Sequence, residues 1–132
     1  VREGACVGPN AHVRGSTVVG PEAHIGHAVE VKNSVLMRGA TVGHLSYVGD
    51  SVLGRDVNFG AGTTVANLRH DDETVSLRVK EEAVDTGRRK FGVVVGDGVK
   101  TGINTSLNAG VKLDTGARTA PNQTVLTDII TE

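Results

Sequence analysis

Six polar residues between positions 14 and 67 have types that could bind a ligand or move a proton. They are Arg14, Lys32, His44, Tyr47, Asn58 and Asn67. Histidine can accept a proton near neutral pH, and two neighbouring cations can hold a phosphate between them. Phenol and amide groups can hold polar ligands by hydrogen bonds. Whether these side chains meet depends on the elements that position them.

A six-residue repeat supplies those elements. An aliphatic side chain recurs about every six positions, often with glycine after it and a small or β-branched residue four positions later. A helix would need a period of 3.6 and a meander an alternation of two, so the spacing predicts short parallel strands in triangular coils. We expect an all-β, left-handed parallel β-helix, a three-sided prism whose glycines lie where the backbone turns sharply at corners.

The prism predicts that the two cations stack. Arg14 and Lys32 follow Val13 and Val31, which lie three hexads apart and therefore on neighbouring coils of one face. At a strand spacing of about 5 Å two cations repel by roughly 3 kcal/mol at an effective dielectric near 20. This pair suggests a phosphate between them. The alternative is that both cations are solvated and point away from each other.

The other polar residues are individually ambiguous. His44 lies on a strand, where a lone histidine is more often a surface residue than a base. Asn58 and Asn67 flank the corner Gly60–Gly62, and an asparagine at a corner commonly mimics backbone hydrogen bonding. The ring of Tyr47 must point outward. Their grouping within a few coils is what favours a site.

Composition narrows the class of protein. The 132 residues fit one domain, 1–132, with a net charge of −1, one cysteine and no apolar run of transmembrane length. These features give no basis for nucleic-acid or membrane binding and exclude an internal disulfide, so we expect a cytoplasmic protein. The period lapses over 68–92, a charged stretch that we expect to form an extruded loop or hairpin.

Two motifs carry a family resemblance. The sequence GHLSYVGD at 43–50, followed by NFGAGTTVAN at 58–67, resembles the C-terminal acetyltransferase domain of bifunctional glucosamine-1-phosphate N-acetyltransferase/nucleotidylyltransferases. The later DTGRRKFG at 85–92 resembles their archaeal branch. The resemblance implies transfer of acetyl from acetyl-CoA, with no metal, to an aminosugar-1-phosphate in UDP-N-acetylhexosamine synthesis. It also implies a homotrimer with sites between subunits, and an N-terminal nucleotidylyltransferase domain that we do not expect in this chain.

The resemblance also implies roles for individual residues. His44 would be the general base in a direct transfer, and Asn67 would position the acetyl group or stabilise the oxyanion. The substrate-binding residues would be Arg14, Lys32, Tyr47, Asn58 and Lys90. The coenzyme-binding residues would be Ala61, Asn67, Ile103 and Ala120.

Some features depart from the family pattern and leave alternatives open. Ile103 stands where many relatives carry a small polar residue, and Ala120–Asn122 replaces a smaller corner that contains glycine. One alternative is a non-catalytic oligomerisation or regulatory tail of a nucleotidylyltransferase. Another is a zinc enzyme like γ-class carbonic anhydrase, because His27 and His44 fall in one column, but the characteristic pair of histidines five apart is missing.

Overall fold

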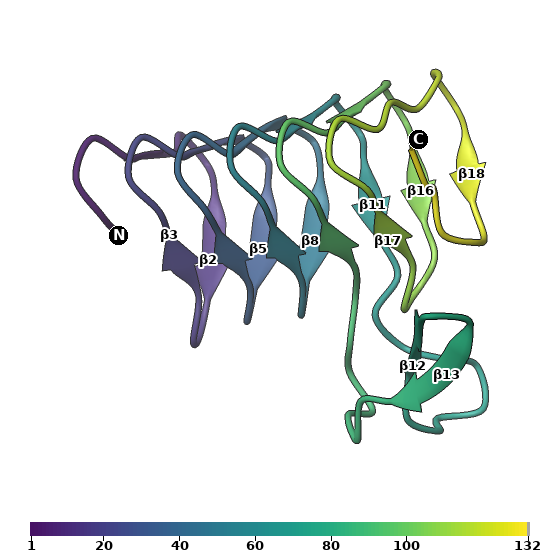
Figure 1. The fold of residues 1–132 in the computed structure, drawn as a ribbon. Coiled ribbons are helices and arrows are strands. Elements are labelled where there is room, and N and C mark those ends of the chain that lie inside the picture. Colours follow the sequence, from purple (N-terminus) through teal and green to yellow (C-terminus); the bar gives the residue numbers. More distant parts are fainter. Residues whose placement is uncertain (132) are drawn as a thin grey trace.

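The computed structural model describes residues 1–131, which wind into a three-sided parallel β-helix (Figure 1). Face 1 contains β1 (Cys6–Val7), β4 (His24–His27), β7 (Thr41–His44), β10 (Asn58–Phe59) and β15 (Lys100–Thr101). Face 2 contains β2 (His12–Arg14), β5 (Glu30–Lys32), β8 (Tyr47–Gly49), β11 (Thr64–Val65), β16 (Ser106–Leu107) and β18 (Thr124–Val125). Face 3 contains β3 (Val18–Val19), β6 (Val35–Leu36), β9 (Val52–Leu53), β14 (Val94–Val95) and β17 (Lys112–Leu113). The all-β, parallel β-helix predicted from the repeat is confirmed.

The hexad aliphatics form the core. One residue of each strand points inward, and the parallel register stacks it on its counterpart in the next coil, as Val31 pairs with Val48 and Leu36 with Leu53. These side chains are almost completely buried. Two threonine pairs continue the core where aliphatics are missing, and Thr63 and Thr101 hydrogen-bond through their hydroxyls at 2.8 Å. The buried hydroxyls are thereby satisfied, so the core remains closed toward the C-terminal coils.

Gly8 has the positive φ expected of a turn, with φ at 107°, but Gly26 has a different role. At Gly26 the φ angle is not in the left-handed region, but a Cβ there would collide with the carbonyl oxygen of Gly43 on the next coil. The positive φ that turns the corner falls two residues later, at Ala28, where φ is 57°. Glycine is therefore needed at Gly26 for the close approach of two coils, and the expectation of a sharp turn at that position was wrong.

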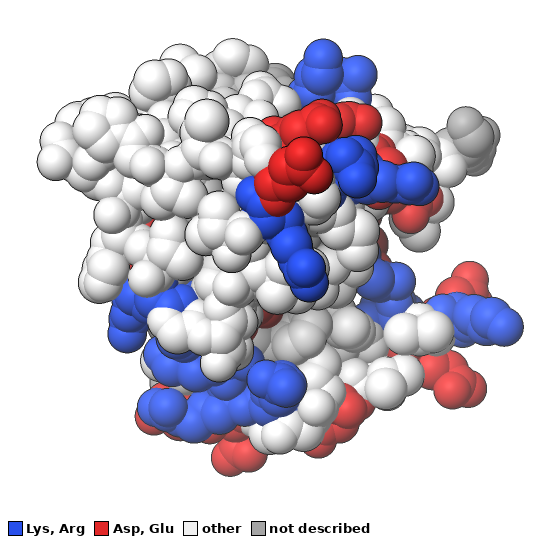
Figure 2. Space-filling model, turned by 90° about the vertical axis from the view of Figure 1, so that its left-hand side faces the viewer, with Lys and Arg blue, Asp and Glu red and all other residues white. Residues whose placement is uncertain are grey.

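The segment 68–92 leaves the prism between face 2 and face 3 and returns to the same place. Its antiparallel strands β12 (Ser76–Val79) and β13 (Glu82–Asp85) form the hairpin that projects below the prism in Figure 1. Leu68 and Lys90 form a bridge at its base, and Phe91 N donates to Asn67 O at 3.0 Å. In the view from the N-terminal end, several Lys and Arg side chains gather at lower left, at the height of this hairpin (Figure 2).

Candidate functional site

His44 ends β7 at the edge where face 1 meets face 2. Its carbonyl accepts hydrogen bonds from Ser46 Oγ at 2.7 Å and Gly62 N at 3.2 Å, so its backbone is tied to its own corner and to the next coil. The side chain is exposed, and no described residue within 1–131 hydrogen-bonds to it. An imidazole held in this way is open to a ligand and able to accept or release a proton.

The same edge carries the residues expected to bind the coenzyme. His27 pairs with His44 in the register of β4 and β7, and backbone hydrogen bonds link Gly62 N to His44 O and Asn104 N to Ala61 O. Extending this register stacks Ile103 beyond Ala61. We call this column the His44 edge, made of His27, His44, Ala61 and Ile103. Ala120 lies beside it, where its backbone would meet a Cβ built on Gly102.

Asn58 is set apart from the other expected substrate ligands. It lies in β10 on face 1, paired with Thr41 on one side and Lys100 on the other, and its side chain is exposed. Asn58 and His44 therefore belong to the same face, whereas Arg14, Lys32 and Tyr47 belong to face 2.

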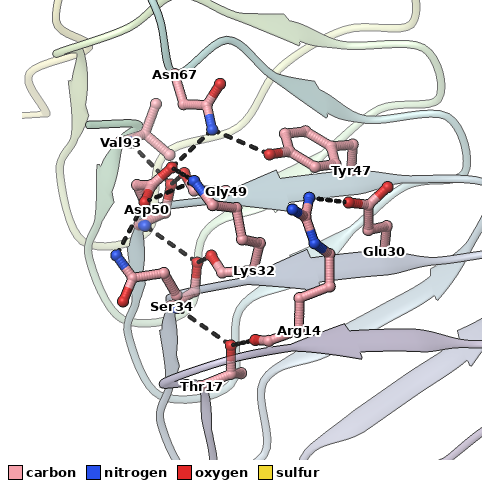
Figure 3. A network of polar contacts seen from close by, with 12 residues as sticks. Arg14, Thr17, Glu30, Lys32, Ser34, Tyr47, Gly49, Asp50, Asn67 and Val93 are labelled. Carbon is pink, nitrogen blue, oxygen red and sulfur yellow. Dashed lines mark hydrogen bonds and ion pairs between the residues drawn. The ribbon is translucent and has the colours of Figure 1, made fainter. Parts of the chain in front are cut away.

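A polar network fills the other edge of face 2, where face 2 meets face 3 (Figure 3). At its centre Asp50 accepts hydrogen bonds from Lys32 Nζ at 2.9 Å, Asn33 Nδ2 at 2.9 Å and Asn67 Nδ2 at 2.7 Å. The Nδ2 of Asn67 also donates to Tyr47 Oη at 3.0 Å. We call the stacked residues Asn33, Asp50 and Asn67 the Asp50 edge.

Sequence reasoning missed Asp50. Its side chain is only 3% exposed, and burial by itself raises the pKa of this carboxyl. Hydrogen bonds from Asn33, Lys32 and Asn67 outweigh burial, so the pKa lies below its ordinary value and the group is ionised at neutral pH. A signal was available in the 17-residue spacing of Asn33, Asp50 and Asn67, which matches one coil of the prism.

The stacking of the two cations is present, but each has its own carboxylate. Arg14 pairs with Lys32 in the register of β2 and β5. Arg14 Nη1 contacts Glu30 Oε2 at 2.8 Å, and Lys32 contacts Asp50. These two acids offset the repulsion expected between the cations. The stacking therefore no longer requires an anion between Arg14 and Lys32.

Lys90 lies at a hollow of about 300 Å³ beside the Asp50 edge. Its lining residues are Ser16, Asn33, Val35, Asp50, Ser51, Val52, Arg88, Lys90 and Phe91. Neither Arg88 nor Lys90 forms an ion pair with any residue in 1–131. These two cations, rather than Arg14 and Lys32, are thus the unpaired positive charges near Asp50. A second groove, of about 420 Å³, lies between the hairpin stem and face 2 and includes His70 and Asn108.

The described part of the chain contains no group of three or more His, Cys, Asp or Glu side chains arranged to hold a metal ion. It also contains no helix long and apolar enough to cross a membrane.

The site residues offer an exposed imidazole at the His44 edge and a bonded set of donors and acceptors at the Asp50 edge. Tyr47 begins β8 three residues after His44, and its hydroxyl accepts a hydrogen bond from Asn67 of the Asp50 edge.

Comparisons with known proteins agree with the sequence motifs. A family model described as the GMPPB C-terminal domain matches residues 1–130. A Sulfurisphaera tokodaii protein named "Bifunctional sugar-1-phosphate nucleotidylyltransferase/acetyltransferase" is 48% identical over 92% of this chain and 30% of its own length. A "Bifunctional protein GlmU" of Methanococcus vannielii is 46% identical over 95% of this chain and 30% of its own. The chain therefore spans about a third of the length of these relatives.

Solved structures share the fold. PerB from Caulobacter crescentus, solved in complex with CoA and GDP-perosamine, has a TM-score of 0.73 at 18% identity and covers 93% of this chain and 49% of its own. The acetyltransferase domain of PglB from Neisseria gonorrhoeae has a TM-score of 0.51 at 21% identity, covering 94% and 50% respectively. At these identities the likeness concerns the β-helix itself.

Proposed function

The chain belongs to the family described as the GMPPB C-terminal domain, and from this premise we propose that it transfers acetyl from acetyl-CoA to the amino group of an aminosugar-1-phosphate. The relative from S. tokodaii is named as a sugar-1-phosphate acetyltransferase and nucleotidylyltransferase, and it supports this reaction class. The nucleotidylyltransferase activity is proposed for the whole protein and not for these residues. The observation that carries the proposal is the exposed His44 imidazole, which lies three residues before Tyr47, whose hydroxyl contacts Asn67 of the bonded Asp50 edge.

In the proposed step the sugar amine attacks the thioester carbonyl carbon directly. A carbon–nitrogen bond forms, and His44 takes the proton that the amine loses. The tetrahedral intermediate then collapses, the carbon–sulfur bond breaks, and the thiolate of coenzyme A leaves with a proton from the imidazolium. The hydrogen bonds to the His44 carbonyl fix its backbone and leave both ring nitrogens free. No acyl-enzyme is involved, so the exposed Cys6 has no part in the reaction.

The remaining residues are proposed to bind the two substrates. Ala61, Ile103 and Ala120 lie along the His44 edge, which gives acetyl-CoA an extended line of small and apolar contacts next to the base. Arg88 and Lys90 supply charge that no acidic side chain within 1–131 pairs with, which favours them for the sugar phosphate. Lys32 and Arg14 border the same region, but each forms an ion pair with an acid, Asp50 and Glu30 respectively. Asn58 on face 1 would contact the sugar from the His44 side.

The homotrimer implied by the resemblance remains part of the proposal. The two groups of residues lie on opposite edges of face 2, with open surface between them. A second copy laid against this face would enclose the ligands and could bring its own edge toward His44. Acetyl-CoA is the proposed co-substrate, and the proposed chemistry assigns no step to a metal.

The proposal is tested by measuring thiol release from acetyl-CoA with glucosamine-1-phosphate and with galactosamine-1-phosphate. We expect turnover by this chain and a fall of about 10² to 10⁴ in kcat for His44→Ala. His27→Ala is the matched control, because His27 is exposed and occupies the same column one coil away, and it should leave turnover unchanged. A folded chain without turnover on either sugar would favour a non-catalytic tail. Dependence of turnover on bound zinc would favour the metal enzyme.

A further inference from the structure

Asp50 determines which way the amide of Asn67 faces. An ionised carboxylate can only accept hydrogen bonds, so the Asn67 atom that lies 2.7 Å from Asp50 Oδ2 must be the nitrogen. The lowered pKa of Asp50 keeps the carboxylate ionised at neutral pH. Asn67 therefore cannot reverse its amide without placing two acceptor oxygens against each other.

The amide hydrogens of Asn67 are both used. One is donated to Asp50, and the other goes to Tyr47 Oη at 3.0 Å. The Asn67 Oδ1 accepts no hydrogen bond from any residue in 1–131, and no described buried side-chain oxygen lacks a partner, so this atom is open to solvent. Figure 3 shows it turned away from Asp50. What Asn67 offers a ligand is an acceptor.

Tyr47 offers a ligand a hydrogen-bond donor, where Asn67 offers an acceptor. Its hydroxyl oxygen accepts from Asn67, and no described residue accepts its own hydrogen. The phenol O–H is thus available as a donor next to the Asn67 acceptor. This leaves Asn67 without a free N–H for an oxyanion, which favours the positioning role expected for it over the oxyanion role.

We propose that Asp50 is a positioning residue that fixes the hydrogen-bonding orientation of Asn67 and Tyr47. The site then presents a donor at Tyr47 and an acceptor at Asn67 to a ligand group that carries an N–H or O–H. The inference rests on the proposed acetyl transfer. Two ligands could supply this group: an amide N–H of the acetyl-CoA arm, or an amine or hydroxyl of the aminosugar phosphate. In either case Asp50 acts through Asn67 and does not touch the ligand.

Asp50→Asn tests this with little disturbance of the backbone. Asparagine has the same shape and tolerates the left-handed conformation of this corner, where φ is 53°. Its amide can donate as well as accept, so Asn67 is no longer held in one orientation. We expect kcat/KM to fall by about 10- to 100-fold. The KM that rises, for acetyl-CoA or for the sugar, identifies which ligand meets Asn67.

A double-mutant cycle separates positioning from a general structural effect. If Asp50 acts through Asn67, Asp50→Asn has no further effect on kcat/KM once Asn67→Ala is present. Independent, multiplying effects of the two substitutions would overturn the inference. The inference would also be overturned if Asp50→Asn lost its effect on kcat/KM only when Lys32→Met is present, because Asp50 would then act through the lysine. Asp128→Asn is the control, since it neutralises another lysine-paired acid and should leave kcat/KM unchanged.

Tyr47→Phe provides a second approach if Asp50→Asn does not fold, as judged by circular dichroism. It keeps the ring and removes the donor and the second anchor of Asn67. We expect a similar fall in kcat/KM for the same ligand, and an unchanged kcat/KM would overturn the inference. The two proposals are distinguishable: turnover by the wild type with normal turnover by Asp50→Asn would reject only the positioning role, whereas absent wild-type turnover would reject the acetyl transfer.

Discussion

The His44 edge and the Asp50 edge are corners of the same prism, built from the same repeat, but their side chains differ in how they hydrogen-bond. At the His44 edge the bonds between coils come from the backbone and from one side-chain contact, Asn10 Nδ2 to His27 Nδ1 at 3.4 Å, and the His44 imidazole has no partner among residues 1–131. At the Asp50 edge side chains bond to one another from coil to coil, around a carboxylate that is 3% exposed.

The difference follows from what each group is proposed to do. A general base must change its protonation during the reaction, so the ring nitrogen that meets the substrate must be free of a permanent hydrogen-bond partner. A group that orients a ligand gains by being fixed before the ligand arrives, because less freedom is then lost on binding. The β-helix supplies both conditions at neighbouring corners, since its backbone holds the coils whether or not the side chains take part.

The largest expected effect tests whether the Asp50 edge also stabilises the fold. Asp50→Ala removes a 3% exposed carboxylate that accepts hydrogen bonds from three side chains, each worth about 1.5–3 kcal/mol to a charged group, so it should lower the free energy of unfolding by about 3–5 kcal/mol. His44→Ala should change it by less than about 0.5 kcal/mol, because the side chain is exposed. Urea denaturation measures both.

Alanine also tolerates the positive φ of Asp50 poorly, so Asp50→Gly is the control that removes the carboxylate without backbone strain. If Asp50→Gly is nearly as stable as the wild type, the loss in Asp50→Ala comes from the backbone. The proposed contrast between a bonded edge and a bare edge would then be wrong.

A smaller effect is expected within the His44 edge itself, where coil-to-coil contact is made by backbone. A Cβ on Gly26 would collide with the carbonyl of Gly43, whereas a Cβ on Gly43 meets nothing within 4 Å. Gly26→Ala should therefore destabilise by about 1–3 kcal/mol, the usual cost of overpacking. Gly43→Ala should be neutral or stabilising, and thermal unfolding compares the two. Equal losses would show that the coils approach less closely at this edge than the structure indicates.

The sequence predicted the edges better than the contacts along them. Hexad spacing sets the register, so the pairing of Arg14 with Lys32 and of His27 with His44 followed directly from counting residues. The partners of the cations did not follow, because Glu30 and Asp50 meet them only through side-chain conformations that spacing does not determine. The same limit applies to Asn67. Its motif predicts a site residue, but it does not predict the hydrogen bonds to Tyr47 and Asp50 on the neighbouring coil.

The glycine pattern shows the same limit. Its period matched the coils but not the residue that turns, which is Ala28, and the reason for glycine at Gly26 is the neighbouring Gly43 carbonyl, a contact 17 residues away in sequence. Local conformational preference predicts turns within one segment. Contacts between coils depend on how closely the coils pack, which the sequence of a single coil does not contain.

The smallest expected effect is a pH dependence that belongs to the Asp50 edge alone. The pKa of Asp50 is lower in the folded protein than in the unfolded chain, so its contribution to stability is complete above about pH 4 and is lost as the pH falls through the folded value. The sign is fixed by linkage, because at low pH the unfolded chain binds this proton more readily than the folded protein does. Asp50→Asn lacks the titration.

Comparing the two proteins isolates this residue. Asp71, Asp85 and Asp97 also have lowered pKa values, and that of Asp71 is about 2, but they are present in both proteins and cancel in the difference. The free energy of unfolding of the wild type should therefore fall toward that of Asp50→Asn as acid is added, with urea denaturation as the measurement. A difference that stays constant from pH 7 to pH 3 would mean that hydrogen-bond geometry, and not the charge of Asp50, holds this edge together.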